Sequence, residues 1–240
     1  MSAPSQSSEQ SSSDLLTKDA CVQLLSGAGI EIGALHRPTI APHLQVTYVD
    51  RISTEDMCAK HPELEAENPP RVEIVDDGAV LSRVADRSQD FVIASHLIEH
   101  LKDPIAGMLN WQRVLKPGGR LFLVVPDKEQ TFDEPREITT NEHLQLDHDE
   151  PSVERDFEHF RDFGLHVSIR QYQAVEEERA EEYAQYLVDI DYDIHFHVWD
   201  LPAFEGFLGM LEQREDYELR VVGRTGVIER EFGFVLERIG

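Results

Sequence analysis

The sequence predicts an α/β protein built on a doubly wound, mainly parallel β-sheet, and three observations support this fold class. The segment from Asp90 to Asp127 contains an apolar run, a helical pattern, a Lys-Pro-Gly-Gly turn and a second apolar run. This order is typical of a right-handed crossover between parallel strands. Three more apolar runs precede it, each bounded by turn-forming residues. The 240 residues and the 40% hydrophobic content suffice for one such domain with an insertion.

Seven segments have the composition of strands. The first five are apolar runs that end near polar or glycine residues, as buried parallel strands do. The last two alternate in character, which suits an antiparallel end to the sheet. The seven segments are 29–33, 44–50, 71–78, the run that starts at Asp90, the run that ends at Asp127, 217–223 and 229–239.

Helices are predicted where apolar residues recur with near-helical spacing. These segments are 15–25, 80–84, 105–115, 153–163, 171–187 and 201–215. Hydrophobicity drops and His, Asp and Glu accumulate over residues 128–193, which we interpret as a mostly helical insertion on the acceptor side of the domain. Residues 1–14 are rich in Ser and have little to bury, so we expect a disordered tail followed by one domain over 15–240.

The composition argues against several partners. A formal net charge of −25, from 47 acidic and 22 basic residues, repels nucleic acid and anionic membrane surfaces. No apolar run approaches the ~20 residues that span a bilayer, and the N-terminus lacks the features of a signal peptide. Cys21 and Cys58 have no disulfide or metal-site spacing. We therefore expect a cytoplasmic protein that binds neither nucleic acid nor membrane.

Two motifs indicate other enzyme classes but stand in the wrong place. Gly27, Gly29 and Gly33 loosely match the glycine motif of NAD(P) oxidoreductases, yet two of these glycines precede the strand instead of following it. Residues 96–100, HLIEH, have the H-x-x-E-H spacing of zinc hydrolases. That motif needs a continuous helix, whereas His96 directly follows a buried strand. Both activities are minor alternatives.

Polar residues at the carboxyl ends of the predicted strands are candidate ligand-binding groups, because parallel sheets bind ligands at that edge. Glu31 and Gly33 combine an acid with close backbone access. Asp50 ends the next strand, where a carboxylate can accept hydrogen bonds from two ribose hydroxyls. Asp77 and Gly78 form a turn that either caps a helix or contacts an adenine amino group.

Taken together, these motifs resemble the class I S-adenosylmethionine-dependent methyltransferases, especially the bacterial methyltransferase type 11-like group. The resemblance covers residues 29–127, with the signatures DFVIASHLIEHL and VLKPGGRLFLVVPD, and the closing helix and strands are also similar. It implies a Rossmann-like seven-stranded sheet with an antiparallel last strand and S-adenosylmethionine as cofactor. The implied cofactor-binding residues are Glu31, Gly33, Ala34, Asp50, Arg51, Asp77, Gly78, Ser95 and His96.

One departure from the family pattern stands beside the first strand. The family usually has three alternating glycines there, whereas Leu35 and Arg37 occupy the second and third positions in this chain. An altered approach of the cofactor is expected. The chain also resembles a bacterial subgroup that shares GIEIGALHRP, VTYVDR, PDKxxTFD and HFHVW, some of whose members are linked to glycan assembly. That resemblance implies methyl transfer to a small acceptor, with a hydroxyl of a sugar or glycan-related molecule as the leading expectation.

A hydroxyl acceptor needs a base, and a positioned His typically contributes ~10²–10⁴-fold to such a proton transfer. His143 is the preferred base. Asp127 and Arg136 are expected to position the acceptor together with Thr140. The alternative is that these residues only tie the insertion down by hydrogen bonds.

The HFHVWD segment carries a second group of acceptor-side candidates. If it is extended, His195, His197 and Trp199 share one face, as an acceptor wall or a metal pair. No metal ligand is assigned, although nearby carboxylates, including Asp147, leave a magnesium-assisted variant open. A non-catalytic or regulatory S-adenosylmethionine-binding protein is the alternative from another functional class.

Overall fold

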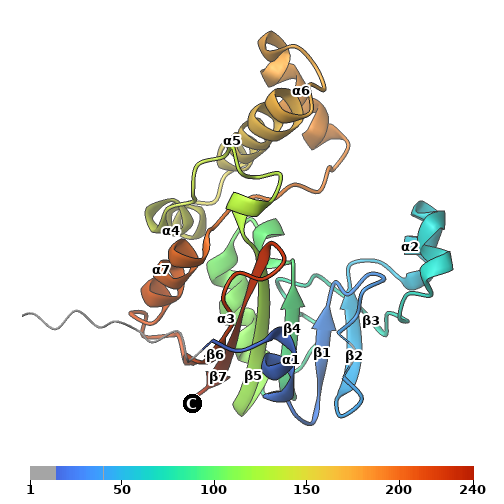
Figure 1. The fold of residues 1–240 in the computed structure, drawn as a ribbon, viewed down its shortest axis with the longest axis vertical. Coiled ribbons are helices and arrows are strands. Elements are labelled where there is room, and N and C mark those ends of the chain that lie inside the picture. Colours follow the sequence, from blue (N-terminus) through green and yellow to red (C-terminus); the bar gives the residue numbers. More distant parts are fainter. Residues whose placement is uncertain (1–14, 40) are drawn as a thin grey trace, which may run out of the picture.

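A seven-stranded sheet forms the centre of the computed structural model, which describes residues 15–39 and 41–240 (Figure 1). The predicted tail of residues 1–14 lies outside the described residues. The strand order is β3-β2-β1-β4-β5-β7-β6. Strands β1 to β5 pair in parallel, and β7 is antiparallel to both β5 and β6, which confirms the predicted fold class. The strands are β1 Ala28–Ile32, β2 Gln45–Asp50, β3 Ile74–Val75, β4 Gln89–Ser95, β5 Leu115–Pro126, β6 Leu219–Arg224 and β7 Glu231–Arg238.

Seven α-helices surround the sheet or extend from it. All except α6 begin at a Ser, Thr or Asp whose side chain accepts a hydrogen bond from the first turn, which satisfies a backbone N–H that has no partner within the helix. The helices are α1 Lys18–Gln23, α2 Thr54–Lys60, α3 Pro104–Val114, α4 Asn141–Asp149, α5 Val153–Phe163, α6 Ala180–Asp189 and α7 Leu201–Leu211.

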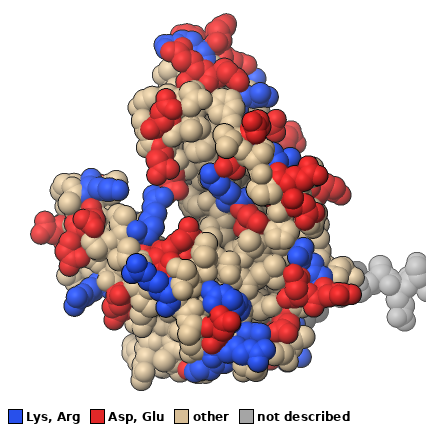
Figure 2. Space-filling model, turned by 180° about the vertical axis from the view of Figure 1, so that it is seen from behind, with Lys and Arg blue, Asp and Glu red and all other residues tan. Residues whose placement is uncertain are grey.

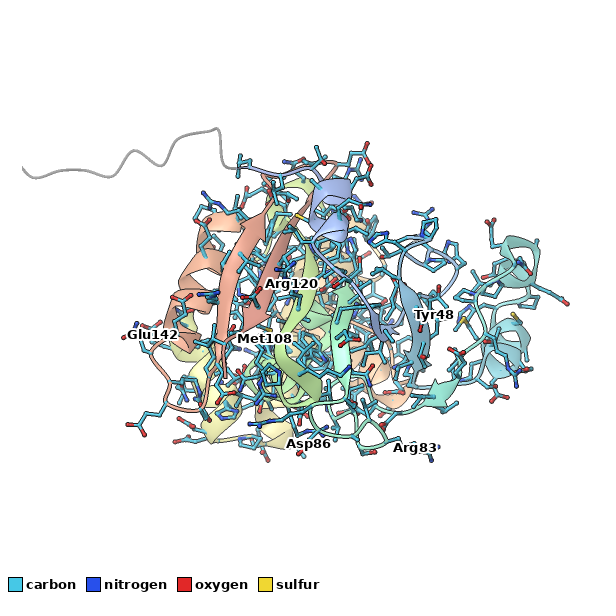
Figure 3. All side chains as sticks on the ribbon, turned by 90° about the horizontal axis from the view of Figure 1, so that it is seen from below. Tyr48, Arg83, Asp86, Met108, Arg120 and Glu142 are labelled. Atoms are coloured by element: carbon cyan, nitrogen blue, oxygen red, sulfur yellow. The ribbon has the colours of Figure 1, made fainter. Side chains whose placement is uncertain are left out.

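The sheet buries both of its faces because successive side chains of a strand point to opposite sides. On one face, Val92 and Ala94 of β4 join a large core with residues of α3 and α7. On the other face, Phe91 and Ile93 pack with Cys21 and neighbouring residues of α1. Met108 of α3 is fully buried and lies within the body of the protein, whereas Glu142 lies at its periphery (Figure 3).

The insertion has a small hydrophobic core of its own. Helices α5 and α6 project beyond one end of the sheet (Figure 1), and a π-helix, Gly164–Gln171, continues from α5. Phe160 and Phe163 of α5 pack with Leu187 of α6 and with Phe196. The insertion is therefore held by apolar packing that is separate from the two clusters on the sheet.

Two predicted helices differ from the structure. Residues 80–84 form turns instead of a helix, because Leu81 has a positive φ and the Asp76 side chain accepts hydrogen bonds from Ser82 and Arg83. The predicted helix over 171–187 is broken near Gln173, which also has a positive φ, and resumes as α6. Helices α2 and α4 were not predicted, because both lie in polar segments and neither carries a broad apolar stripe.

Acidic side chains are spread over the face in Figure 2 with basic side chains among them. The negative charge therefore forms no continuous single-sign field on this face. In the described part of the chain, no helix combines the length and the apolar character that a membrane span requires.

An ionic contact ties the end of β4 to the start of β7. His96 Nε2 lies 2.7 Å from Glu231 Oε2, and His96 Nδ1 lies 3.5 Å from Glu99 Oε1. Glu231 also accepts a hydrogen bond from Lys18, the first residue of α1, at 2.6 Å. The hydrogen bond with Glu231 and the nearby Glu99 carboxylate outweigh the effect of burial and raise the pKa of His96 to about 9.

This contact predicts a pH-dependent contribution to stability. Because the folded-state pKa of His96 lies above its ordinary value of 6.5, the contribution is complete below that pH and is lost as the pH rises through about 9. The side chain is 45% exposed, so water screens the interaction and the effect should be about 1 kcal/mol or less. His96→Asn suits the test, since Asn tolerates the positive φ of this position.

Urea unfolding of the wild-type protein and of His96→Asn at pH 6 and pH 10 measures the difference in unfolding free energy. We expect the wild-type advantage to be larger at pH 6, whatever constant offset the new side chain adds. Equal differences at the two pH values would contradict a charged His96 in the folded protein.

Candidate functional site

A cavity of about 290 Å³ opens at the carboxyl ends of β1 to β4. Its wall comes from the turns that follow these four strands and from Asp193 of the insertion. Six of the nine residues predicted to bind the cofactor line it together, and these are Gly33, Asp50, Arg51, Asp77, Gly78 and His96. Their cofactor role stays a prediction, but the fold brings them to one place from four separate strands.

Glu31 stabilises the loop that follows β1 and does not line the cavity. It is 1% exposed, and its two carboxylate oxygens accept hydrogen bonds from the Thr39 backbone N–H at 2.9 and 3.0 Å. Burial raises the pKa of Glu31, against these hydrogen bonds. The carboxylate thus closes the loop that follows β1. Ala34 lies in this loop, and Ser95 pairs with Val124 at the end of β4; neither lines the cavity.

The loop after β1 keeps a left-handed backbone where the family motif has glycines. Gly33 has φ +66°, and a Cβ placed on it meets no atom within 4 Å, so the space above it is open. Leu35 has φ +47°, a conformation that costs a side chain of this kind about 1–2 kcal/mol. The missing glycine therefore leaves the turn intact and adds an apolar side chain to the cavity wall.

Asp50 has unused capacity to accept hydrogen bonds at the end of β2. The residue is 9% exposed, and its side chain accepts one long hydrogen bond, from Ile52 N at 3.5 Å. Burial raises the pKa of Asp50, against the hydrogen bond from Ile52 and the charge of Arg51. A carboxylate that is desolvated in this way gains when a ligand donates hydroxyl hydrogens to it.

The turn after β3 lets the backbone approach β1 closely. A Cβ on Gly78 would lie 2.6 Å from Ile32 Cγ2, so a larger residue does not fit without a shift. The Gly78 carbonyl accepts a hydrogen bond from Trp111 Nε1 at 2.8 Å, which links the turn to α3. Asp77 Oδ1 caps the turn by accepting from Ala79 N at 2.8 Å. Asp77 therefore caps a turn and not a helix.

The cavity fits the chemistry of S-adenosylmethionine. An open backbone turn lies above β1, an underused carboxylate ends β2, and a cap-forming acid follows β3. Three carboxylates in its wall, at Asp50, Asp77 and Asp193, outnumber the two positive groups, Arg51 and the protonated His96, which suits a ligand with a positively charged sulfur. That Asp50 holds the ribose and that Asp77 and Gly78 flank the adenine stay predictions.

A second group of polar residues borders the cavity on the side of the insertion. His195 Nδ1 lies 2.6 Å from Asp133 Oδ2, and Asp133 is 1% exposed. The His195 ring stands edge-on to that of His100, a residue of the cavity wall, with 4.7 Å between the centroids. The buried Glu99 carboxylate has no hydrogen-bond donor in good geometry among the described residues. No role was predicted for Asp133, and Glu99 was considered only as part of the HLIEH motif.

The His195 and Asp133 pair has the arrangement of a base and its orienting carboxylate. Burial acts to raise the pKa of Asp133, but the hydrogen bond and charge of His195 and the charge of Arg136 outweigh it and lower that pKa. Asp133 is therefore ionised and accepts the Nδ1 hydrogen of His195. Nε2 is then the ring nitrogen that can accept a proton.

Several acceptor-side candidates surround a different cavity, of about 390 Å³. Arg136, Thr140 and His143 line it, and none of them lines the cavity at the strand ends. Arg136 is 3% exposed and donates hydrogen bonds to Asp133, Asp162 and the His195 carbonyl. Thr140 caps α4. For Arg136 and Thr140, the contacts match the alternative in which these residues tie the insertion down.

Asp127 also has a structural contact set. It is 5% exposed, its Oδ1 accepts from Glu129 N at 3.0 Å, and its backbone forms an isolated bridge with Trp199. Burial raises the pKa of Asp127, against the hydrogen bond from Glu129.

The HFHVWD segment is not the continuous extended strand considered above. It bends at Phe196, so His195 and His197 enter different clusters and form no metal pair with each other. His197 is fully buried, and Trp199 is 1% exposed and stacks on Phe207. Neither side chain faces an open acceptor cavity, which corrects the expectation of an acceptor wall.

The HLIEH motif does not form the helix that a zinc hydrolase requires. His96 has φ +50°, and only residues Ile98–His100 form a single 3₁₀ turn. The two histidines consequently have different partners: His96 contacts Glu231, and His100 Nδ1 contacts the Ile194 carbonyl.

Comparison with known proteins gives matches to the sequence and to the fold. Residues 23–123 match a family described as a methyltransferase domain. An uncharacterized 37.1 kDa protein in transposon TN4556 of Streptomyces fradiae is 29% identical over 118 residues. That match covers 49% of this chain and 33% of the relative, so it spans about a third of the relative's length.

Two solved structures illustrate the likeness in fold. A SAM-dependent methyltransferase from Aquifex aeolicus is 14% identical, with a TM-score of 0.48 over 92% of this chain and 88% of that one. An O-methyltransferase family protein from Burkholderia thailandensis is also 14% identical, with a TM-score of 0.46 over 92% of this chain and 55% of that one.

The domain match spans the strands whose carboxyl ends surround the 290 Å³ cavity. It falls on a sheet in which the antiparallel β7 lies between β5 and β6, the arrangement that the sequence resemblance implies. Residues 23–123 are therefore similar to a methyltransferase domain, and the sheet has the arrangement that the sequence resemblance to class I S-adenosylmethionine-dependent methyltransferases implies.

Proposed function

We propose that this protein transfers a methyl group to a hydroxyl oxygen of a small polar acceptor, with a sugar or glycan-related molecule as the leading class. The observation that carries the proposal is the His195 and Asp133 pair beside His100 at the edge of the strand-end cavity. S-adenosylmethionine supplies a methyl group on a positively charged sulfur. A hydroxyl is a weak nucleophile, so a base at this edge favours oxygen as the accepting atom.

Different residues would hold the cofactor and accept the proton. Asp50 would accept hydrogen bonds from the ribose, while the open turn at Gly33 would leave room for the methionine end. The bound cofactor would supply the methyl group to the acceptor oxygen and would leave as S-adenosylhomocysteine, with the electron pair of the carbon–sulfur bond on its sulfur. The hydroxyl proton would pass to His195 Nε2, and Asp133 would stabilise the resulting imidazolium.

The surroundings of His195 support a polar acceptor. Phe132 packs against the His195 ring with 4.7 Å between the centroids, and Arg51 and Asp193 form a 3.4 Å ion pair beside the cavity. An aromatic ring next to charged groups can bind the apolar face and the hydroxyls of one sugar ring. The expected cytoplasmic location and the expected lack of nucleic-acid partners remain part of this proposal.

The second candidate is a regulatory protein that binds S-adenosylmethionine without transferring its methyl group. Leu35 in place of a family glycine is the observation that favours it, because this side chain lines the cavity at a position where the family motif has none. Binding without transfer to any acceptor would distinguish this function from an enzyme.

Cofactor binding should depend on the Asp50 carboxylate. Asp50→Ala should weaken the binding of S-adenosylmethionine and S-adenosylhomocysteine by about 10–100-fold, since hydrogen bonds to a charged group contribute about 1.5–3 kcal/mol. Titration calorimetry measures both dissociation constants, and Asp19→Asn on the exposed face of α1 is the matched control. No binding of either ligand to the wild-type protein would end the enzyme proposal, and an unchanged Asp50→Ala would remove Asp50 from the site.

Methyl transfer should depend on His195 as the base. His195→Gln should slow methyl transfer by about 10²–10⁴-fold with little change in cofactor affinity, and Asp133→Asn should slow it less. Transfer of labelled methyl groups to a panel of hydroxyl-bearing carbohydrates measures the rate, with exposed His61→Gln as the control.

Comparison with His143→Gln decides between the two candidate bases. If His143→Gln abolishes transfer and His195→Gln leaves it intact, the base is His143 and the His195 assignment is wrong.

A further inference from the structure

We propose that the insertion holds a zinc ion between His143, Asp147, His159 and His197. The donor atoms of these four side chains all lie within 4.8 Å of one another. His143 and Asp147 come from one face of α4, His159 comes from α5, and His197 comes from the segment that leads to α7. The site is separate from the strand-end cavity and does not depend on the proposed reaction.

The distances match a tetrahedral centre. His143 Nε2 lies 2.9 Å from His159 Nε2 and 3.0 Å from Asp147 Oδ2. Asp147 Oδ2 lies 3.4 Å from His159 Nε2 and 3.8 Å from His197 Nε2. Zinc bonds of ~2.0–2.1 Å in tetrahedral geometry place neighbouring donor atoms about 3.3 Å apart. The four measured separations bracket this value.

The hydrogen bonds around the cluster orient its atoms toward a common centre. His159 Nδ1 donates to the Arg155 carbonyl at 2.9 Å, which leaves a lone pair on Nε2 of the neutral ring. Arg155 donates to Asp147 Oδ1 from Nε at 2.7 Å, so Oδ2 is the oxygen that faces the histidines. Outer contacts of this kind fix the tautomer and direction of metal ligands.

Without an ion, the cluster leaves buried polar atoms poorly satisfied. Among the described residues, Asp147 Oδ2, the oxygen that faces the histidines, has no hydrogen-bond partner in good geometry. Asp147 is 5% exposed and His197 is fully buried, so water does not reach them freely. His197 Nε2 makes only a 3.4 Å contact with the Lys102 carbonyl. Buried groups of this kind are rare unless something else binds them.

The ligand chemistry selects the ion. Three imidazoles and one carboxylate suit zinc, whereas magnesium and calcium prefer oxygen ligands. Four protein ligands leave no open position, which is typical of a structural site. His143 is 40% exposed and lines the 390 Å³ cavity together with His159, and this cavity gives the ion a route of entry. The zinc would join α4, α5 and the segment two residues beyond His195.

The test measures zinc directly on the full chain without a histidine tag. After removal of metal with chelator, reloading with zinc and gel filtration, we expect about one zinc per chain by mass spectrometry. His143→Gln and His159→Gln should each lower the zinc affinity at least 10-fold. His148→Gln is the matched control, because His148 also lies on α4 but contacts Asp103. The control should keep its zinc.

Thermal unfolding provides a second measurement that does not depend on the metal analysis. Zinc should raise the unfolding midpoint of the wild-type protein, because an ion that binds only the folded state stabilises it. The rise should be smaller in His143→Gln and unchanged in His148→Gln. Wild-type protein that retains no zinc after reloading, or ligand variants that retain as much as the control, would overturn the proposal.

Discussion

The carbonyl oxygen of Glu99 is the point on which the geometry of the insertion depends. It accepts hydrogen bonds from the backbone N–H groups of Phe196 at 2.7 Å and His197 at 3.3 Å. Glu99 stands in the 3₁₀ turn directly after β4, next to the strand-end cavity. These two bonds therefore fasten the returning end of the insertion to the edge of the sheet where cofactor binding is proposed, and they bring His195 to His100.

The sheet provides a fixed frame for this contact. Strands β4 and β5 are buried on both faces, and their register sets the positions of the turn at His96 and of the exit at Asp127. The insertion leaves at Asp127 and returns at Trp199, and the backbones of these two residues bridge each other. A long excursion of the chain is thus closed at its base, so its side chains keep a defined position relative to the cavity.

The strands could be predicted from the sequence because each has a local pattern, either an apolar run or an alternation. The candidate binding residues could be predicted because parallel sheets bind ligands at the carboxyl ends of their strands. The insertion could not be predicted in the same detail. His195 and Asp133 are 62 residues apart, and periodicity carries no information on contacts at that range. Arg136 was expected to position the acceptor, but tertiary folding buries it against Asp133 and Asp162. Positive φ angles at Leu81 and Gln173 ended two predicted helices.

The histidines of HFHVWD show how one bend separates two chemical roles. Phe196 packs against Phe160 in the small core of the insertion, with 5.6 Å between the ring centroids. This packing turns His195 toward His100 and His197 toward His159. In the proposed scheme, the first ring handles a proton and the second binds a metal. Because only Phe196 stands between them, an ion at His197 would also hold the backbone that positions His195, so the stability of the insertion and the placement of the base would be coupled.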